Sequence, residues 1–139
     1  MLLEKVWVVL NDIKEEGLEN VHRRHERLTR ATHAAVKAMG LKRIAPDSPA
    51  NSATGAFVPE GIDGGKLVRF IRDDMGVTLA GGQDHWKGKV VRIAHLGYID
   101  SFDIIIAISA LEMGLKKFGH DVTLGKSVAA AQEVLLEGY

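Results

Sequence analysis

Two short stretches rich in β-branched residues, with only a brief loop between them, constrain this fold more than any other feature. "VTLA" at 77–80 and "VVRIA" at 90–94 both read as strands, and the loop "GGQDHWKGK" joins them. A parallel pair would need a crossover of a dozen or more residues, usually containing a helix. The two strands are therefore predicted to pair antiparallel.

Most of the remaining chain shows helical spacing, with apolar residues recurring every three or four positions. Helices are expected over 2–16, from 18 to the stop at Gly40, between a capping Asp63 and Gly76, from Asp100 or Ser101 to Phe118, and over 124–136. Two further short strands are expected at 42–45 and 54–58.

This order of elements predicts one domain over residues 1–139. The sequence contains no internal repeat, no low-complexity tract and no linker that would divide it. The helices carry enough apolar surface to cover one face of a small sheet. We therefore predict an α+β fold, a two-layer domain with a small, mainly antiparallel sheet covered on one face by helices.

Composition excludes several classes of function. Eighteen basic residues balance eighteen acidic ones, so no net field favours nucleic acid or an anionic membrane. The lack of cysteine excludes disulfides and thiolate-held metal clusters, and fits a reducing compartment. The apolar run "IIIAISALEMGL" is too short to cross a bilayer, and "MLLEKVWVVL" is a poor secretory signal. We expect a cytoplasmic protein without nucleic-acid or membrane partners.

Arg92 interrupts an otherwise apolar strand. Because side chains alternate between the two faces of a sheet, Val91 and Ile93 point one way while Arg92 points the other. An arginine on a rigid strand, in partly apolar surroundings, is well suited to bind a carboxylate through two parallel hydrogen bonds. The pattern alone favours a structural salt bridge or plain solvent exposure, since most charged residues on strands are solvated.

Three other features carry weaker signals. His22, His25 and His33 lie in one predicted helix, but no carboxylate is placed as a clear fourth metal ligand. We therefore assign no metal and interpret them as core or interface histidines. The run "HRRHER" reads as a solvated helix face. The glycine-rich loop "AGGQDHWKGK" links two strands and leads into no helix, which argues against a phosphate loop.

Three segments resemble one known family. "EEGLENVHRRHERLTRATHAAVKAMGLK", "VTLAGGQDHWKGKVVRIAHLGYIDSFDIIIAISALEMGL" and "VAAAQEVL" are similar to the C-terminal small domain of class V pyridoxal-phosphate-dependent aminotransferases, of the alanine/serine–glyoxylate type. The most specific element is the glycine pair, the "GK" turn and "RIAHLGY". The family commonly has glycine where this chain has Ala94.

This resemblance implies a site. The family's strand arginine matches Arg92 and binds the α-carboxylate of a small amino acid during transfer of its amino group to glyoxylate or pyruvate. Gly81 and Gly82 would lie in a loop at the mouth of the active site, where glycine permits unusual dihedral angles. His95 and Tyr98 follow the arginine strand and could line the pocket, although capping or packing roles suit them equally well.

The resemblance also implies a missing part. In the family, the Schiff-base lysine and most cofactor contacts belong to a large domain that precedes this one. No lysine here matches the cofactor-lysine motif, so the isolated chain is expected to bind no pyridoxal phosphate and to be inactive. The sheet face that would meet the large domain is expected to be uncovered, which predicts self-association, with a dimer as the simplest product.

A different class of function remains open. A free-standing α+β module could use the same sheet face to hold a protein partner and perform no chemistry. Some members of this subgroup carry the label of a soluble hydrogenase small subunit. A chain without cysteine cannot itself hold nickel–iron or iron–sulfur centres by thiolate, so we treat that label as naming history.

Overall fold

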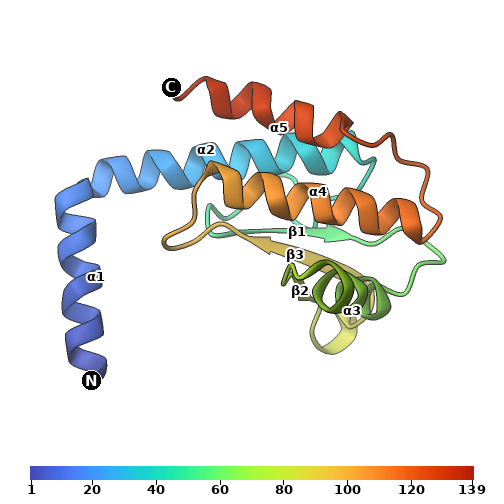
Figure 1. Cartoon of the computed structure of the whole chain (residues 1–139), viewed down its shortest axis with the longest axis horizontal. Helices are drawn as coiled ribbons and strands as arrows, with labels where there is room; N and C mark the ends of the chain where they lie inside the picture. Colours follow the sequence, from blue (N-terminus) through green and yellow to red (C-terminus); the bar gives the residue numbers. More distant parts are fainter.

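Five helices and three strands form the domain in the computed structural model, which describes all residues, 1–139 (Figure 1). The helices are α1 (Leu2–Glu16), α2 (Leu18–Ala38), α3 (Gly64–Met75), α4 (Ser101–Lys117) and α5 (Lys126–Leu136). The strands are β1 (Ala53–Phe57), β2 (Ala80–Gly81) and β3 (Val90–Ala94), and a 3-10 turn covers Asp84–Trp86. The predicted α+β class is confirmed.

The sheet has the order β1-β3-β2, and both pairings are antiparallel, as predicted for the two closely spaced strands. The expected strand at 77–80 is wrong in extent, because only Ala80 and Gly81 pair with β3. Continuing the register would place Leu79 opposite Ile93, but here the chain diverges from β3. The chain segment between α3 and β2 therefore runs beside the sheet without joining it.

The strand expected at 42–45 is also wrong, since it is reduced to a single bridge between Arg43 and Ala56. Two backbone hydrogen bonds flank this bridge, from Ile44 N to Gly55 O and from Phe57 N to Lys42 O. Pro46 follows at once, and proline has no N–H with which to extend a ladder.

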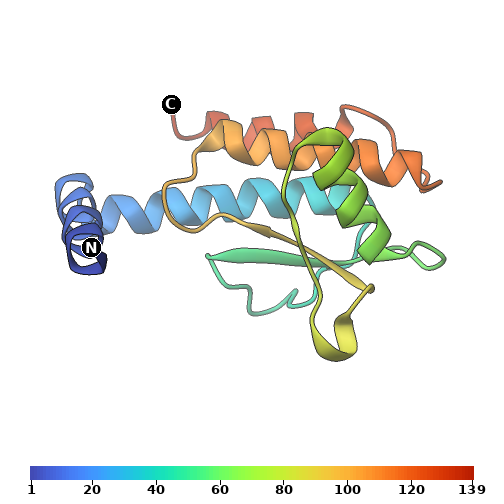
Figure 2. The same cartoon turned by 60° about the horizontal axis from the view of Figure 1, so that its bottom comes forward.

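Helices α2, α4 and α5 lie on one side of the sheet, as seen by comparing Figures 1 and 2. Val91 and Ile93 of β3 point to that side and are 1% and 3% exposed. They join a continuous core that includes Leu28, Ile71 and Leu111, none of which is more than 1% exposed. The alternation inferred from "VVRIA" is therefore confirmed.

Gly114 lets α3 and α4 approach each other closely. A Cβ atom at this position would lie 2.9 Å from Ile71 Cδ1 and 3.0 Å from Leu67 Cδ1. Any larger residue at position 114 would therefore push α3 away from the core.

Glu112 is an acidic residue inside the core, only 2% exposed. Its carboxylate accepts hydrogen bonds from the backbone N–H groups of Gly125 (2.6 Å) and Ser127 (2.9 Å) at the start of α5. A helix N-terminus presents unpaired N–H groups and a partial positive charge, so the carboxylate is stabilised there without a cation. Glu112 thus fastens α5 to α4.

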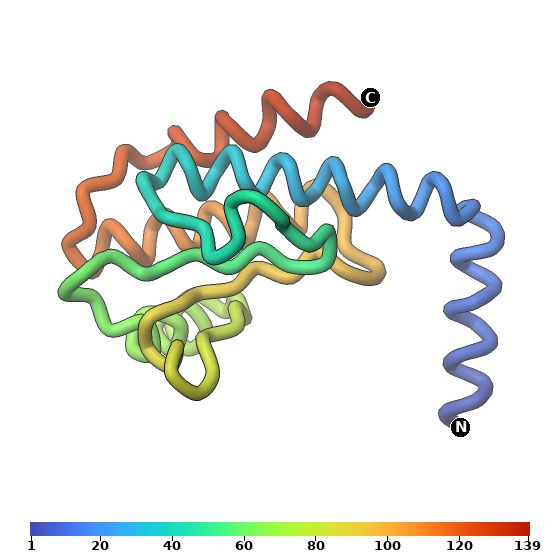
Figure 3. Tube along the Cα trace, turned by 180° about the vertical axis from the view of Figure 1, so that it is seen from behind, coloured from blue at the N-terminus to red at the C-terminus, as the bar shows by residue number.

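Helix α1 is formed as predicted, but it contributes no residue to the core. None of its residues is buried, and Figures 1 and 3 show it projecting from the end of α2, away from the rest of the chain. None of the helices combines the length and apolar character that crossing a bilayer requires.

We predict that Glu112→Ala lowers the free energy of unfolding by about 2–3 kcal/mol, because it leaves the buried N–H of Ser127 and the part-buried N–H of Gly125 without acceptors. Urea denaturation followed by circular dichroism measures this. Glu133→Ala, on the exposed face of α5, should change stability by less than about 0.5 kcal/mol. Equal effects of the two substitutions would contradict the capping role of Glu112.

Candidate functional site

Arg92 lies at the middle of the central strand. Its cross-strand neighbours are Gly55 on β1 and Ala80 on β2, so both flanking side chains are minimal. The side chain is half-buried on the face opposite the helices. We expected this face to be uncovered. The Ile44 side chain packs over Gly55 and covers part of it.

The guanidinium group of Arg92 is held from one side only. Its Nε donates a 2.9 Å hydrogen bond to the carbonyl oxygen of Gly81, and no other protein group bonds to it. The four ion pairs of the chain all involve other residues. The two terminal nitrogens of Arg92 are therefore free, and the structural salt bridge considered from the sequence does not exist.

A hollow of about 600 Å³ opens beside Arg92. Its walls are the diverging segment 76–80, the end of β3 and the first turns of α4, and ten of its 14 lining residues are hydrophobic. The charged members are Arg92 and Asp103, and Asp103 Oδ2 already accepts a hydrogen bond from Asp100 N. An apolar hollow with one free cation suits a small ligand that carries an anionic group.

Neither Gly81 nor Gly82 lines the hollow, and neither has φ in the left-handed range. Gly81 supplies the carbonyl that holds Arg92. Gly82 is required for space, because a Cβ atom there would collide with the backbone carbonyl of Trp86. The expectation about their backbone conformation is therefore wrong.

The structure separates the two residues that follow the strand. Tyr98 is fully exposed and lies at the wall of the hollow, with Arg92. His95 is completely buried on the opposite, helix-covered face and does not line the hollow. Its Nδ1 donates to Asn51 O (3.2 Å), and its Nε2 lies 2.9 Å from Thr54 Oγ1, so the packing alternative holds for His95.

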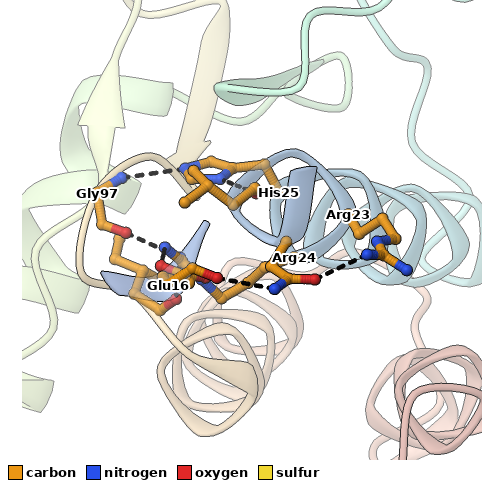
Figure 4. A network of polar contacts seen from close by, with 8 residues as sticks. Glu16, Arg23, Arg24, His25 and Gly97 are labelled. Atoms are coloured by element: carbon orange, nitrogen blue, oxygen red, sulfur yellow. Dashed lines mark hydrogen bonds and ion pairs between the residues drawn. The ribbon is translucent and has the colours of Figure 1, made fainter. Parts of the chain in front are cut away.

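A polar network missed at the sequence level holds the loop after β3 (Figure 4). Arg24 binds both carboxylate oxygens of Glu16, at 2.7 and 3.0 Å, and donates to the carbonyls of Gly97 (2.9 Å) and Ile99 (3.2 Å). His25 Nε2 accepts from Gly97 N at 3.3 Å. The hydrogen bonds of Arg24 hold the pKa of Glu16 below its usual range.

The run "HRRHER" predicted a solvated helix face, and for Arg24 this prediction is wrong. Arg24 ties the end of α1, the first turns of α2 and the exit of the arginine strand together. The only sequence signal was the pairing of an acid and a base on either side of Gly17, which is too common to be diagnostic.

The histidines of α2 occupy different environments. His25 is buried, and its Nδ1 donates to Val21 O, while His22 is exposed. His33 Nδ1 accepts a 2.8 Å hydrogen bond from Arg43. Burial, with the nearby charge of Arg43 and a smaller contribution from His95, lowers the pKa of His33 from 6.5 to about 4.

No family model matches the chain. Individual proteins do match, over nearly its whole length. It is 43% identical to the soluble hydrogenase small subunit of Synechococcus sp. (strain PCC 6716), covering 91% of this chain and 33% of that protein. It is 40% identical to the serine–glyoxylate aminotransferase of Methylorubrum extorquens, covering 88% of this chain and 31% of that enzyme.

Solved structures share the fold. The pyridoxamine–pyruvate aminotransferase of Mesorhizobium loti superposes with a TM-score of 0.90 at 30% identity, over 95% of this chain and 34% of that one. This chain belongs with the small C-terminal domains of the class V aminotransferases. The small domain described here spans about one third of the length of the relatives it matches.

In this small domain, acid should destabilise the fold through its buried histidines. The pKa of His33 is about 4 when folded against 6.5 ordinarily, and burial also lowers the pKa of His95. Between these values the unfolded chain binds more protons, so stability is full above about pH 6.5 and falls toward pH 4. His33→Asn should flatten this decline in urea denaturation at pH 4.5 to 7.5, while His22→Asn should leave it unchanged.

The two loop glycines should respond differently to alanine. Gly82→Ala must displace the Trp86 backbone and should lower the free energy of unfolding by about 2 kcal/mol or more. Gly81→Ala meets nothing closer than Val90 O at 4.0 Å and should cost less than about 1 kcal/mol. Thermal melts of both variants measure the difference, and similar losses would show that the turn adapts to either change.

Proposed function

We propose that this domain serves a pyridoxal-phosphate-dependent aminotransferase that transfers an amino group from a small amino acid to glyoxylate or pyruvate. Arg92 binds the α-carboxylate of the substrate. The observation that carries this proposal is a half-buried arginine that pairs with no protein carboxylate and lines an apolar hollow of about 600 Å³. The relatives named for serine–glyoxylate and pyridoxamine–pyruvate transfer support the choice of substrates.

The geometry suits bidentate binding. The hydrogen bond from Nε to Gly81 O fixes one edge of the guanidinium plane, and both terminal nitrogens remain free to donate. A carboxylate can accept from these two nitrogens in parallel. Placing Arg92 on a strand paired on both sides keeps this edge in position, and such orientation of a substrate can contribute several kcal/mol to catalysis.

The cofactor belongs to the part of the enzyme that this chain does not span. Pyridoxal phosphate supplies the electron sink for the reaction and attaches to a lysine amine. No lysine lines the hollow, and Arg92 is its only cation, so these residues alone do not fit the cofactor. We therefore expect the isolated chain to bind no pyridoxal phosphate and to be inactive. We also propose a cytoplasmic location, because a chain without cysteine fits a reducing compartment.

A non-catalytic interaction or assembly module is the second candidate, and the exposed apolar residues of α1 favour it. They also predict self-association of the isolated chain, which sedimentation at increasing concentration would detect. In such a module Arg92 would have no small-molecule ligand, so variants of Arg92 separate the two candidates.

The role of Arg92 can be tested in a fusion protein. This fusion joins the first two thirds of the Methylorubrum extorquens enzyme to this domain, and Arg92 is replaced in it. Arg92→Met removes two charge-assisted hydrogen bonds and should lower kcat/KM for serine by about 10² to 10³-fold. Arg92→Lys should lower it less. The visible absorbance of the bound cofactor should not change in either variant.

Arg69→Met serves as the control, because Arg69 is an exposed arginine on α3, outside the hollow. It should leave kcat/KM unchanged. An Arg92→Met variant with the KM of the unmodified protein would refute carboxylate binding by Arg92.

A further inference from the structure

A hollow at the end of α2 gathers positive charge without any acidic residue. Its volume is about 460 Å³, and its walls are the last turns of α2 and the chain that follows this helix. Lys37, Lys42 and Arg43 line it together with His33. None of these three cations takes part in the four ion pairs of the chain. Asp47 is near in sequence, but it is exposed and does not line the hollow.

The opposite end of α2 carries a cluster in which the charges are balanced. A hollow of about 620 Å³ there is lined by four arginines and three glutamates. Two of the glutamates form ion pairs, Glu16 with Arg24 and Glu137 with Arg30. The whole chain also has equal numbers of acidic and basic residues. The unbalanced charge at the end of α2 is therefore a local property of the fold.

The backbone after α2 brings the cations together. Gly40 has φ of 72°, in the left-handed range, and reverses the chain shortly after Lys37. The backbone hydrogen bonds around the bridge from Arg43 to Ala56 then hold the next stretch against β1 (Figure 3). The helix dipole favours one basic residue in the last turn, Lys37, but it does not explain Lys42 and Arg43, which lie beyond the helix.

His33 adds a directed hydrogen-bond donor to the hollow. Its Nδ1 accepts a 2.8 Å hydrogen bond from Arg43, and a guanidinium group cannot accept, so this nitrogen carries no proton. Burial, then the charge of Arg43 and a smaller contribution from His95, lower the pKa of His33 to about 4, so the ring is neutral at pH 7. The proton of the neutral ring therefore lies on Nε2, and no protein group accepts it.

The three cations suit a phosphate group. Arg43 is half-buried, and its two terminal nitrogens donate to His33 Nδ1 and to Pro46 O (3.3 Å), so its charge meets no carboxylate. Lys37 and Lys42 are exposed, and their flexible stems allow both ammonium groups to approach a ligand from the solvent side. Arginine and lysine together are the usual donors to phosphate oxygens in proteins.

We propose that this hollow binds a small anion through its phosphate group, either free phosphate or a phosphate monoester. A phosphate group carries nearly two negative charges at pH 7, which match three cations better than the single charge of a carboxylate. The volume is within the range of small-molecule sites, and Ala34 and Leu41 supply an apolar wall for the rest of an ester. The site shares no lining residue with the hollow beside Arg92, so this inference does not rest on the proposed function.

Isothermal titration calorimetry of this chain with glycerol 3-phosphate, inorganic phosphate and glycerol tests the proposal. We expect saturable one-to-one binding of glycerol 3-phosphate with a Kd of about 1 mM or lower, and no binding of glycerol. Tighter binding of the ester than of inorganic phosphate identifies a monoester site, and equal or tighter binding of inorganic phosphate identifies a free-phosphate site. If neither anion binds, the proposal is wrong.

Two substitutions made together locate the binding. Lys37→Gln with Lys42→Gln removes two charges from exposed positions and should weaken binding by about tenfold or more. Arg23→Gln is the matched control, because Arg23 is an exposed arginine of the balanced cluster on the same helix, and it should bind normally. Arg92→Met should also bind normally. Unchanged affinity in the lysine variant, or lost affinity in Arg92→Met, would place the anion elsewhere and overturn the proposal.

The ring resonances of His33 give a second readout by NMR. Saturating glycerol 3-phosphate should shift them and raise the pKa of His33, because a bound anion offsets the charge of Arg43. The resonances of His22, which is exposed on the same helix, should not move. Circular dichroism checks that each variant is folded, and calorimetry of the fusion protein gives the same comparison if this chain self-associates. Unchanged His33 resonances at saturation would also refute the site.

Discussion

The alternation of side chains along β3 is the constraint on which the rest of this domain depends. Val91 and Ile93 anchor the strand in the helix-covered core, and their burial forces Arg92 onto the other face. Antiparallel pairing on both edges prevents the strand from sliding, since a shift by one residue would put the guanidinium group into the apolar core. The position of the arginine is thus enforced by the energetics of the core.

The surroundings of Arg92 follow from departures from regular structure. The chain between α3 and β2 pairs with β3 at only two residues, and its divergence before Ala80 opens the hollow. Gly82 permits the tight approach of the Trp86 backbone, so the loop folds back sharply after the Gly81 carbonyl has bonded Arg92. At the other end of β3, Arg24 and His25 hold Gly97 from both its carbonyl and its N–H.

The sequence predicted the helices well, because their hydrophobic spacing and glycine stops agree with their packing. The Asp63 cap and the Asp100 cap are both found, as are the antiparallel pair and the face of Arg92. The short strands at 42–45 and 77–80 were overestimated, since strand length depends on partners distant in the sequence and not on local composition. Two features were not predictable: the capping of α5 by Glu112, and the network of Arg24. Each joins elements whose contact arises only in the folded chain.

The divergence of the chain before β2 has one more consequence. Thr78 is exposed and borders the hollow, yet it neither pairs with β3 nor enters the core. A change of size or polarity at this position would alter the space beside Arg92 without disturbing the sheet or the helices. In the proposed function, the residue that binds the acid group is therefore separate from a residue that borders the space for the rest of the ligand.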